Sequence, residues 1–270
     1  MRVIYDIAIF TFKEGLRHKI LYGVVVFASL MICLSVLLSG MFMRDISKIL
    51  LDVCLSAVSL GGLLIPFFLA INLIAYDLES RTVYSILSLP VSRSKYILGK
   101  YFGLCLLILL IMGVLTIATF LAIQGGVFLF SAYYFSSISI ASILIAVAIA
   151  ALGNMVLLGC VFLWSSVTTS AFLVTLLTLA TYIIGQTIEE IVRFMAAQTA
   201  GVSFSPIFKK AIEVILYIFP NLASFDLKQQ AAHAQILSLQ HTSLLIGYGL
   251  AYIGVMLGLT IFFFARRDLS

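Results

Sequence analysis

Residues 99–123 read GKYFGLCLLILLIMGVLTIATFLAI, in which Lys100 is the one charged side chain. A helix of about 20 apolar residues crosses the roughly 30 Å hydrocarbon core of a bilayer. Because the apolar residues run continuously instead of alternating, the backbone hydrogen bonds must be made within the segment, as they are in a helix. The stretch therefore predicts a transmembrane helix.

The same kind of stretch recurs along the whole chain. Of its 270 residues, 63% are hydrophobic and 10% are charged, whereas soluble domains carry roughly 25% charged residues. The other five predicted spans are residues 20–42, 50–76, 137–163, 169–187 and 242–265. We therefore expect an all-α polytopic membrane protein with six transmembrane helices in a single transmembrane domain, residues 1–270.

Lysine and arginine are unevenly divided between the two sides that six spans create. The termini and the connection between the second and third spans hold ten of the sixteen, namely Arg2, Lys13, Arg17, Lys19, Arg81, Arg93, Lys95, Lys100, Arg266 and Arg267. Basic residues concentrate on the cytoplasmic side of membrane proteins. We expect both termini and residues 77–98 in the cytoplasm, and the long connection 188–241 on the other side.

The N-terminal residues 1–19 mix charged and apolar side chains. They include Arg2, Asp6, Lys13 and Glu14, and no small-residue cleavage site follows a short apolar core, so they do not form a signal peptide. We expect a helix that lies on the cytoplasmic leaflet and leads into the first span. The alternative is a plain cytoplasmic extension of that span.

Residues 77–98, DLESRTVYSILSLPVSRSKYIL, form a compact charged interruption between apolar runs. At 100° per residue, the part from Leu78 to Leu89 separates an apolar half from a polar half. Glu79 falls in the apolar half, where an unpaired carboxylate is costly, so we expect it to meet a cation or a backbone donor on a partner. Pro90 ends this helix. The simpler alternative is an amphipathic helix that rests on lipid.

Motifs for catalysis and metal binding are missing from the sequence. There is no GxSxG or HExxH motif, the four cysteines stand singly in predicted spans, and the three histidines fit no metal-ligand spacing. The pair Gly99-Lys100 lacks the upstream glycine and the following Ser or Thr of a phosphate-binding loop. We expect no catalytic residue, no metal site and no ATP hydrolysis on this chain.

A few polar or small residues lie in or beside the predicted spans. Asn72, Asn154 and Gln186 are the strongest polar residues there, and a substrate path and interhelical hydrogen bonding explain them about equally well. Gly254 and Gly258 belong to a small-residue series that permits close packing of the last span. No ionisable residue falls near the middle of a predicted span, which argues against a proton-coupled carrier.

The long connection 188–241 has amphipathic character of its own. Residues 186–198 and 205–218 each carry apolar side chains at helical spacing. They are interpreted either as re-entrant or interfacial helices that cap a pathway, or as a platform for a periplasmic partner. The strongly apolar second stretch favours the cap.

Several short segments resemble one membrane-protein family. The run Glu79-x-Arg81-Thr82, followed by Leu87-Ser-Leu-Pro90-Val-Ser-Arg93 and then Gly99-Lys100, resembles the cytoplasmic coupling region of ABC-2 type transporter permeases. Residues 11–22, 220–226 and 266–269 resemble other parts of that family, so the likeness covers essentially the whole chain. The chain length and long fifth loop are similar, more weakly, to the permease that serves copper-site maturation of nitrous-oxide reductase.

The resemblance implies an ABC-2, type V exporter-like architecture in a bacterial inner membrane. Two copies, expected to be a homodimer, would form the substrate pathway and bind two separate ATPase subunits that hold ATP and magnesium. It implies export, with mechanical coupling to a periplasmic maturation partner or a non-transporting anchor as alternatives. Membrane lipids are expected partners and nucleic acid is not. The implied coupling contacts are Glu79, Arg81, Thr82, Tyr84, Leu87, Ser88, Pro90 and Arg93.

Overall fold

Every regular element in the described part of the computed structural model is helical, which confirms the predicted all-α class. The structure describes residues 2–17, 20–41, 46–73, 92–135, 138–168, 170–196, 210, 218–233 and 239–266. In chain order the elements are α1 (Arg2–Leu16), α2 (Ile20–Met41), α3 (Ile46–Leu64), the π-helical turn η1 (Ile65–Ala70), α6 (Arg93–Phe130), the 3₁₀ turn η2 (Ala132–Phe135), α7 (Ile140–Val167), α8 (Ala171–Ala196), the 3₁₀ turn η3 (Ala223–Phe225), α10 (Lys228–Ala232) and α11 (Leu239–Arg266).

Within the described residues, six stretches of helix are long and apolar enough to cross a membrane, as the sequence predicted. They are Tyr22–Met41, Ile46–Leu73, Arg93–Phe130, Ile140–Val167, Ala171–Phe194 and Gln240–Arg266. The largest difference from the predicted bounds is in α6, which was expected over residues 99–123. Its 38 residues measure about 57 Å at 1.5 Å per residue, well beyond the roughly 30 Å of hydrocarbon. A hydropathy window misses helix ends that lie outside the apolar stretch.

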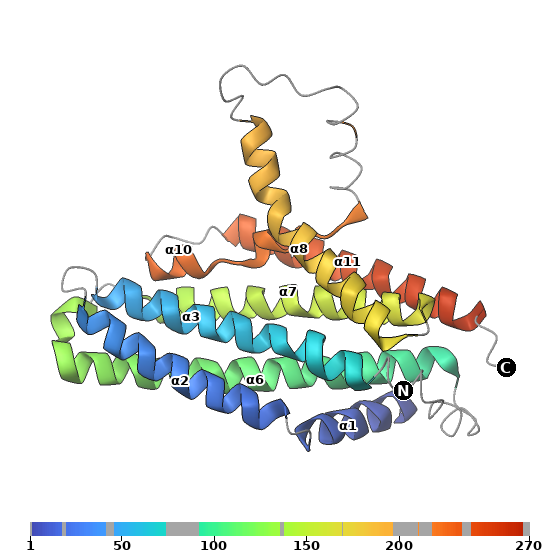
Figure 1. Ribbon diagram of the computed structural model, residues 1–270, viewed down its shortest axis with the longest axis horizontal. Coiled ribbons are helices and arrows are strands. Elements are labelled where there is room, and N and C mark those ends of the chain that lie inside the picture. The colour runs from blue at the N-terminus through green and yellow to red at the C-terminus, as the bar shows by residue number, and fades with distance from the viewer. Residues whose placement is uncertain are drawn as a thin grey trace.

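The long helices lie roughly side by side along one axis (Figure 1). α6 contacts α1, α2, α3 and α7, and α11 packs mainly on α7. The beginning of α1 and the end of α11 lie at the same end of the bundle, where the second span also ends and α6 begins (Figure 1). The last part of α8 points away from the bundle axis. The fold therefore brings four chain segments together at one end.

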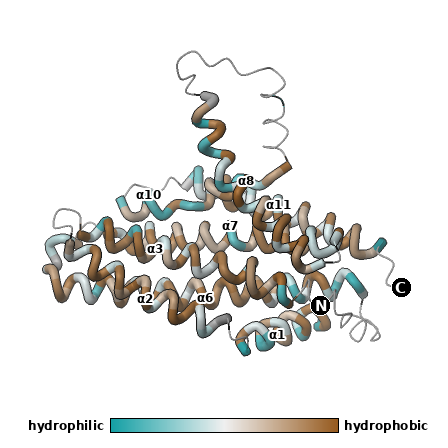
Figure 2. The backbone as a smooth tube through the Cα atoms, in the orientation of Figure 1, coloured by the Kyte–Doolittle hydropathy of each residue, from teal (hydrophilic) through white to brown (hydrophobic). Residues whose placement is uncertain are grey.

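Burial divides the six spans into two groups. In α3, α6 and α7, between 50 and 61% of the apolar window is buried, whereas in α2, α8 and α11 the share is 22 to 28%. Apolar residues nevertheless continue along the outer helices (Figure 2). An apolar outer surface is what a helix in contact with lipid requires. The three central helices thus form the core that the others surround.

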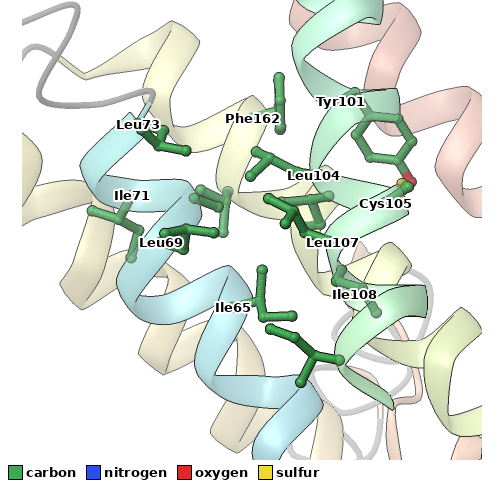
Figure 3. Packing of buried hydrophobic residues seen from close by; sticks show 14 of the residues in the cluster. Ile65, Leu69, Ile71, Leu73, Tyr101, Leu104, Cys105, Leu107, Ile108 and Phe162 are labelled. Atoms are coloured by element: carbon green, nitrogen blue, oxygen red, sulfur yellow. The ribbon is translucent and has the colours of Figure 1, made fainter. Parts of the chain in front are cut away.

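A proline interrupts the regular helix of the second span. Pro66 has no backbone N–H and its ring clashes with the preceding turn of an α-helix, and here the chain makes the π-helical turn η1. The span still continues to Leu73. Ile65 and Leu69 of this turn are buried in the cluster that includes Leu107 of α6 (Figure 3).

The N-terminal helix α1 is packed closely on α6. A side chain at Gly99 would lie 2.7 Å from Ile7, and one at Gly103 would lie 2.6 Å from the carbonyl oxygen of Ala8. The pair Gly99 and Gly103, four residues apart on one face of α6, therefore lets the two backbones approach. The helix expected within residues 1–19 is present, and its place on the leaflet stays a prediction.

Candidate functional site

Arg93 connects the beginning of α6 to the end of α11 through hydrogen bonds. Its Nη1 donates hydrogen bonds to the carbonyl oxygens of Phe264 and Ala265, each at 3.1 Å. The last carbonyl groups of a helix have no partner within the helix and carry partial negative charge. A guanidinium group at this position both satisfies two of them and stabilises the helix dipole.

Lys100 holds the beginning of α6 to the end of the second span. The residue is 3% exposed, and its Nζ donates to the carbonyl oxygen of Leu73 at 2.5 Å. The same ammonium group lies 5.6 Å from the centre of the Tyr96 ring, within the range of a cation–π contact. A buried cation is costly unless such partners are present. Lys100 therefore links the residues on either side of the connection 74–91.

Residues 218–233, called the docked segment below, pack against the spans α7 and α11. A side chain at Gly153 of α7 would come within 2.8 Å of the Cβ atom of Phe225, and one at Gly249 of α11 would come within 3.1 Å of the Phe225 ring. Phe225 is 2% exposed. The missing side chains of the two glycines thus create the space that this phenylalanine fills.

Backbone hydrogen bonds fix the first half of the docked segment. The N–H of Leu222 donates to the carbonyl oxygen of Gly185 in α8 at 3.0 Å. The N–H of Asn221 donates to the hydroxyl group of Tyr248 in α11 at 3.0 Å, and a side chain at Gly185 would approach the carbonyl oxygen of Pro220 to 2.7 Å. The segment is therefore held by two helices that are distant in sequence.

A cavity of about 340 Å³ lies between α3, α7, α8 and the docked segment. Its wall is apolar in part, with leucines from α3, α7 and the docked segment. Five uncharged polar side chains also face it, namely Ser56 and Ser59 of α3, Asn154 of α7, and Tyr182 and Gln186 of α8. A largely apolar pocket with a few convergent hydrogen-bonding groups is the usual form of a small-molecule site.

The docked segment adds two charged side chains to this cavity. Asp226 and Lys228 form an ion pair with an Oδ2 to Nζ distance of 2.8 Å. They also border a small gap next to Ser59, which is the fourteenth residue of the 28-residue span that begins at Ile46. Folding thus brings two ionisable groups beside the middle of a span, although neither belongs to a span in the sequence.

A second cavity, of about 350 Å³, adjoins the first. The two share Gln186, Asp226 and Lys228. The second is lined mainly by polar residues, including Glu189 and Arg193, which form an ion pair on α8. The shared residues therefore separate a mixed inner cavity from a polar outer one.

Residues 7–269 match a protein family described as "ABC-2 family transporter protein". The chain belongs to this ABC-2 family. A comparison with curated proteins gave no significant match. Because the family match covers nearly the whole chain, it confirms the resemblance expected from the coupling run. This ABC-2 protein is thus a multi-pass membrane permease of a transporter family whose members generally pair with ABC ATPase subunits.

Most of the expected coupling residues of this ABC-2 chain fall outside the described residues. These are Glu79, Arg81, Thr82, Tyr84, Leu87, Ser88 and Pro90. Arg93 is described and binds α11. Lys100 was counted with the cytoplasmic charges, and its burial could not be read from the sequence, where it simply precedes an apolar run.

The expected pathway or packing residues of the ABC-2 chain divide into three groups. Asn154 and Gln186 line the same cavity. Asn72 instead donates to the carbonyl oxygen of Phe68 in its own span, at 2.5 Å, on an exposed face. A side chain at Gly254 or Gly258 would meet no atom of the described residues within 4 Å, so neither packs against the helices that the structure describes.

Sequence reasoning missed the charged part of this site in the ABC-2 protein. In the sequence, the segment Pro220-Asn-Leu-x-x-Phe225-Asp226 indicates only the family resemblance, and Ser56, Ser59 and Tyr182 belong to no motif. Single serines and tyrosines are common in apolar helices, so they carry no local signal. Among the residues that the structure describes, no three His, Cys, Asp or Glu side chains are placed to hold a metal ion.

Proposed function

We propose that this chain is the permease subunit of an ABC exporter in a bacterial inner membrane, with two copies forming the pathway and two separate ATPase subunits binding ATP and magnesium. The observation that carries the proposal is how the helices on either side of residues 74–91 are bound. Lys100 binds Leu73 on one side of these residues, and Arg93 beyond their other side binds the end of α11. A displacement at the beginning of α6 can therefore be transmitted to α11 and to the second span.

The coupling step follows from these contacts. When the two ATPases close on ATP, the helix expected between Leu78 and Leu89 moves as a rigid body with its nucleotide-binding partner. Arg93 transmits this displacement to α11 and Lys100 transmits it to the second span. Because that span also carries Ser56 and Ser59, movement at the coupling end reaches the cavity.

The predicted topology agrees with this arrangement. Ten of the sixteen basic residues belong to the termini and the connection near residues 77–100. The beginning of α1, the end of α11, the end of the second span and the beginning of α6 lie at one end of the bundle (Figure 1). The positive-inside rule assigns that end to the cytoplasm, where the ATPases would bind. Exposed Gly254 and Gly258 on α11 support close approach of a second copy.

The proposal is tested with Glu79→Ala in the complex of this chain with its ABC ATPase partner, reconstituted in nanodiscs. The loss of one charge-assisted hydrogen bond is worth about 1.5 kcal/mol or more, so ATPase stimulation should fall about tenfold while membrane insertion stays normal. Asp52→Ala, which removes an exposed carboxylate from α3, serves as the matched control.

Two outcomes would contradict the proposal. Unchanged stimulation in Glu79→Ala would remove that residue from the coupling contact. Purification of the chain without any ATPase, under conditions that keep the dimer intact, would favour the non-transporting membrane anchor instead.

A further inference from the structure

We propose that the cavity between α3, α7, α8 and the docked segment binds an uncharged ligand group rich in hydroxyl or amide functions. The site lies within one protomer, so it goes beyond a pathway formed between two copies. Binding there does not depend on the ATPase partner. The ligand group can belong to a free solute or to the headgroup of a lipid, because both present the same chemistry.

The size and lining of the cavity suit a small polar ring or chain. Its volume of about 340 Å³ is at the lower end of the range for small-molecule sites, about 300 to 1,000 Å³. The hydroxyl groups of Ser56, Ser59 and Tyr182 can each donate and accept hydrogen bonds. Leucines on the other walls can cover the C–H surface of the same ligand.

Asn154 provides an amide with little competition from the protein. Its side chain is 7% exposed, and its Nδ2 donates to the sulfur atom of Met112 at 3.5 Å, which is a weak acceptor. A buried amide gains from a stronger hydrogen-bond partner. Gln186 brings a second amide to the same cavity from α8. Two amides therefore converge on the ligand from different helices.

The charges of the site favour a ligand with no net charge. The carboxylate group of Asp226 and the ammonium group of Lys228 already neutralise each other at 2.8 Å. An anion or a cation in the partly enclosed cavity would add an uncompensated charge beside the middle of a span, which is unfavourable. An uncharged ligand can hydrogen-bond to either group without breaking the pair.

The outer cavity provides a polar route to this site. It shares Gln186, Asp226 and Lys228 with the inner one. A polar ligand group that enters can therefore replace its hydrogen bonds to water with hydrogen bonds to these side chains. The inner cavity has a less polar lining than the outer one, so its apolar side chains can then contact the C–H groups of the ligand. The ion pair stands at the junction of the two cavities.

The chain carries its own reporter for binding. Trp164 is its one tryptophan, and the indole Nε1 donates to the hydroxyl group of Thr181 at 3.1 Å. Thr181 precedes the cavity residue Tyr182 in α8. Binding that shifts α8 relative to α7 should therefore change the tryptophan fluorescence of the full chain in nanodiscs.

The first experiment titrates this chain, without an ATPase, with methyl glucoside, choline and glycerol 3-phosphate as uncharged, cationic and anionic probes. A parallel arm compares nanodiscs with glucosyl diacylglycerol and with phosphatidylglycerol, which separates a lipid headgroup from a free solute. We expect a saturable response to the uncharged probe in one of the two arms. No response to either uncharged probe, or a stronger response to a charged one, overturns the proposal.

Variants connect the response to the cavity. Gln186→Ala should weaken binding of the uncharged probe about fivefold, the effect of one hydrogen bond, and Asn72→Ala should leave it unchanged. Asp226→Asn leaves Lys228 as a net positive charge and should shift preference towards glycerol 3-phosphate. Equal binding in Gln186→Ala and the unsubstituted chain, or unaltered charge preference in Asp226→Asn, contradicts this site. Thermal unfolding of each variant establishes that it is folded.

Discussion

At the beginning of α6, cationic side chains bind backbone carbonyl groups, whereas in the cavity between α3, α7 and α8 a lysine binds a carboxylate. Arg93 and Lys100 donate to carbonyl oxygens of α11 and the second span, and the gap beside Lys100 holds only about 10 Å³. Asp226 and Lys228 neutralise each other beside about 340 Å³ of open space. The first arrangement fixes helices relative to one another, and the second leaves room for a ligand.

Glycines support both regions, but they admit different partners. Gly99 and Gly103 let the regular helix α1 approach α6, whereas Gly153 and Gly249 admit the ring of Phe225 from an irregular segment. Helix against helix gives a continuous contact. One aromatic anchor leaves the residues after it, including the ion pair, free to line a space. The same residue type therefore produces a tight contact at one site and a cavity wall at the other.

The largest effect is expected from removing the buried cation. Lys100→Met keeps most of the side-chain volume but loses the hydrogen bond to Leu73, which is worth about 1.5 to 3 kcal/mol. ATPase stimulation in the reconstituted complex should fall about tenfold or more. Lys13→Met, which removes an exposed cation from α1, should have little effect. Equal activity of the two variants would separate Lys100 from coupling.

Filling the position that Phe225 occupies should disrupt the cavity between α3, α7, α8 and the docked segment. Gly153→Leu places a side chain where the ring now lies, so the docked segment must shift at a cost of about 1 to 3 kcal/mol. We expect a lower thermal unfolding temperature and loss of the probe response of Trp164. Gly113→Leu, at a position with no described atom within 4 Å, is the control. Retained binding in Gly153→Leu would show that the docked segment does not shape the site.

A smaller effect is expected where Arg93 caps α11. Arg93→Gln removes the positive charge from the helix end, worth about 1 kcal/mol. Backbone amides in the last turn of α11 should therefore exchange hydrogen about fivefold faster in nanodiscs, as measured by mass spectrometry. Arg193→Gln breaks an exposed pair within α8 and should not alter exchange in α11. Unchanged exchange in Arg93→Gln would mean that the cap does not hold the helix end.

The smallest effect concerns a single hydroxyl group. Tyr248→Phe leaves the N–H of Asn221 without its acceptor, which should cost about 0.5 to 1.5 kcal/mol. Thermal unfolding followed by Trp164 fluorescence should detect a modest decrease. Tyr22→Phe, at a side chain that is 73% exposed, should match the unsubstituted chain. A decrease of the same size in both variants would count against the hydrogen bond.

The sequence by itself determined the six helices and the family. Continuous apolar runs must form helices in lipid because each segment has to satisfy its own backbone hydrogen bonds. That requirement is local, so it can be read from a window of about 20 residues. The coupling run from Glu79 to Arg93 carried the family resemblance for a similar reason, since its motif lies within one short segment.

The tertiary structure decided where the charges and the cavity lie. Asp226 and Lys228 follow the spans α3 and α7 by many residues, and the anchoring of the docked segment, with Phe225 against Gly153 and Gly249, brings them there. The burial of Lys100 likewise depends on the carbonyl oxygen of Leu73, 27 residues earlier. Contacts between distant residues have no periodic signal in the sequence, because they depend on how complete helices pack together.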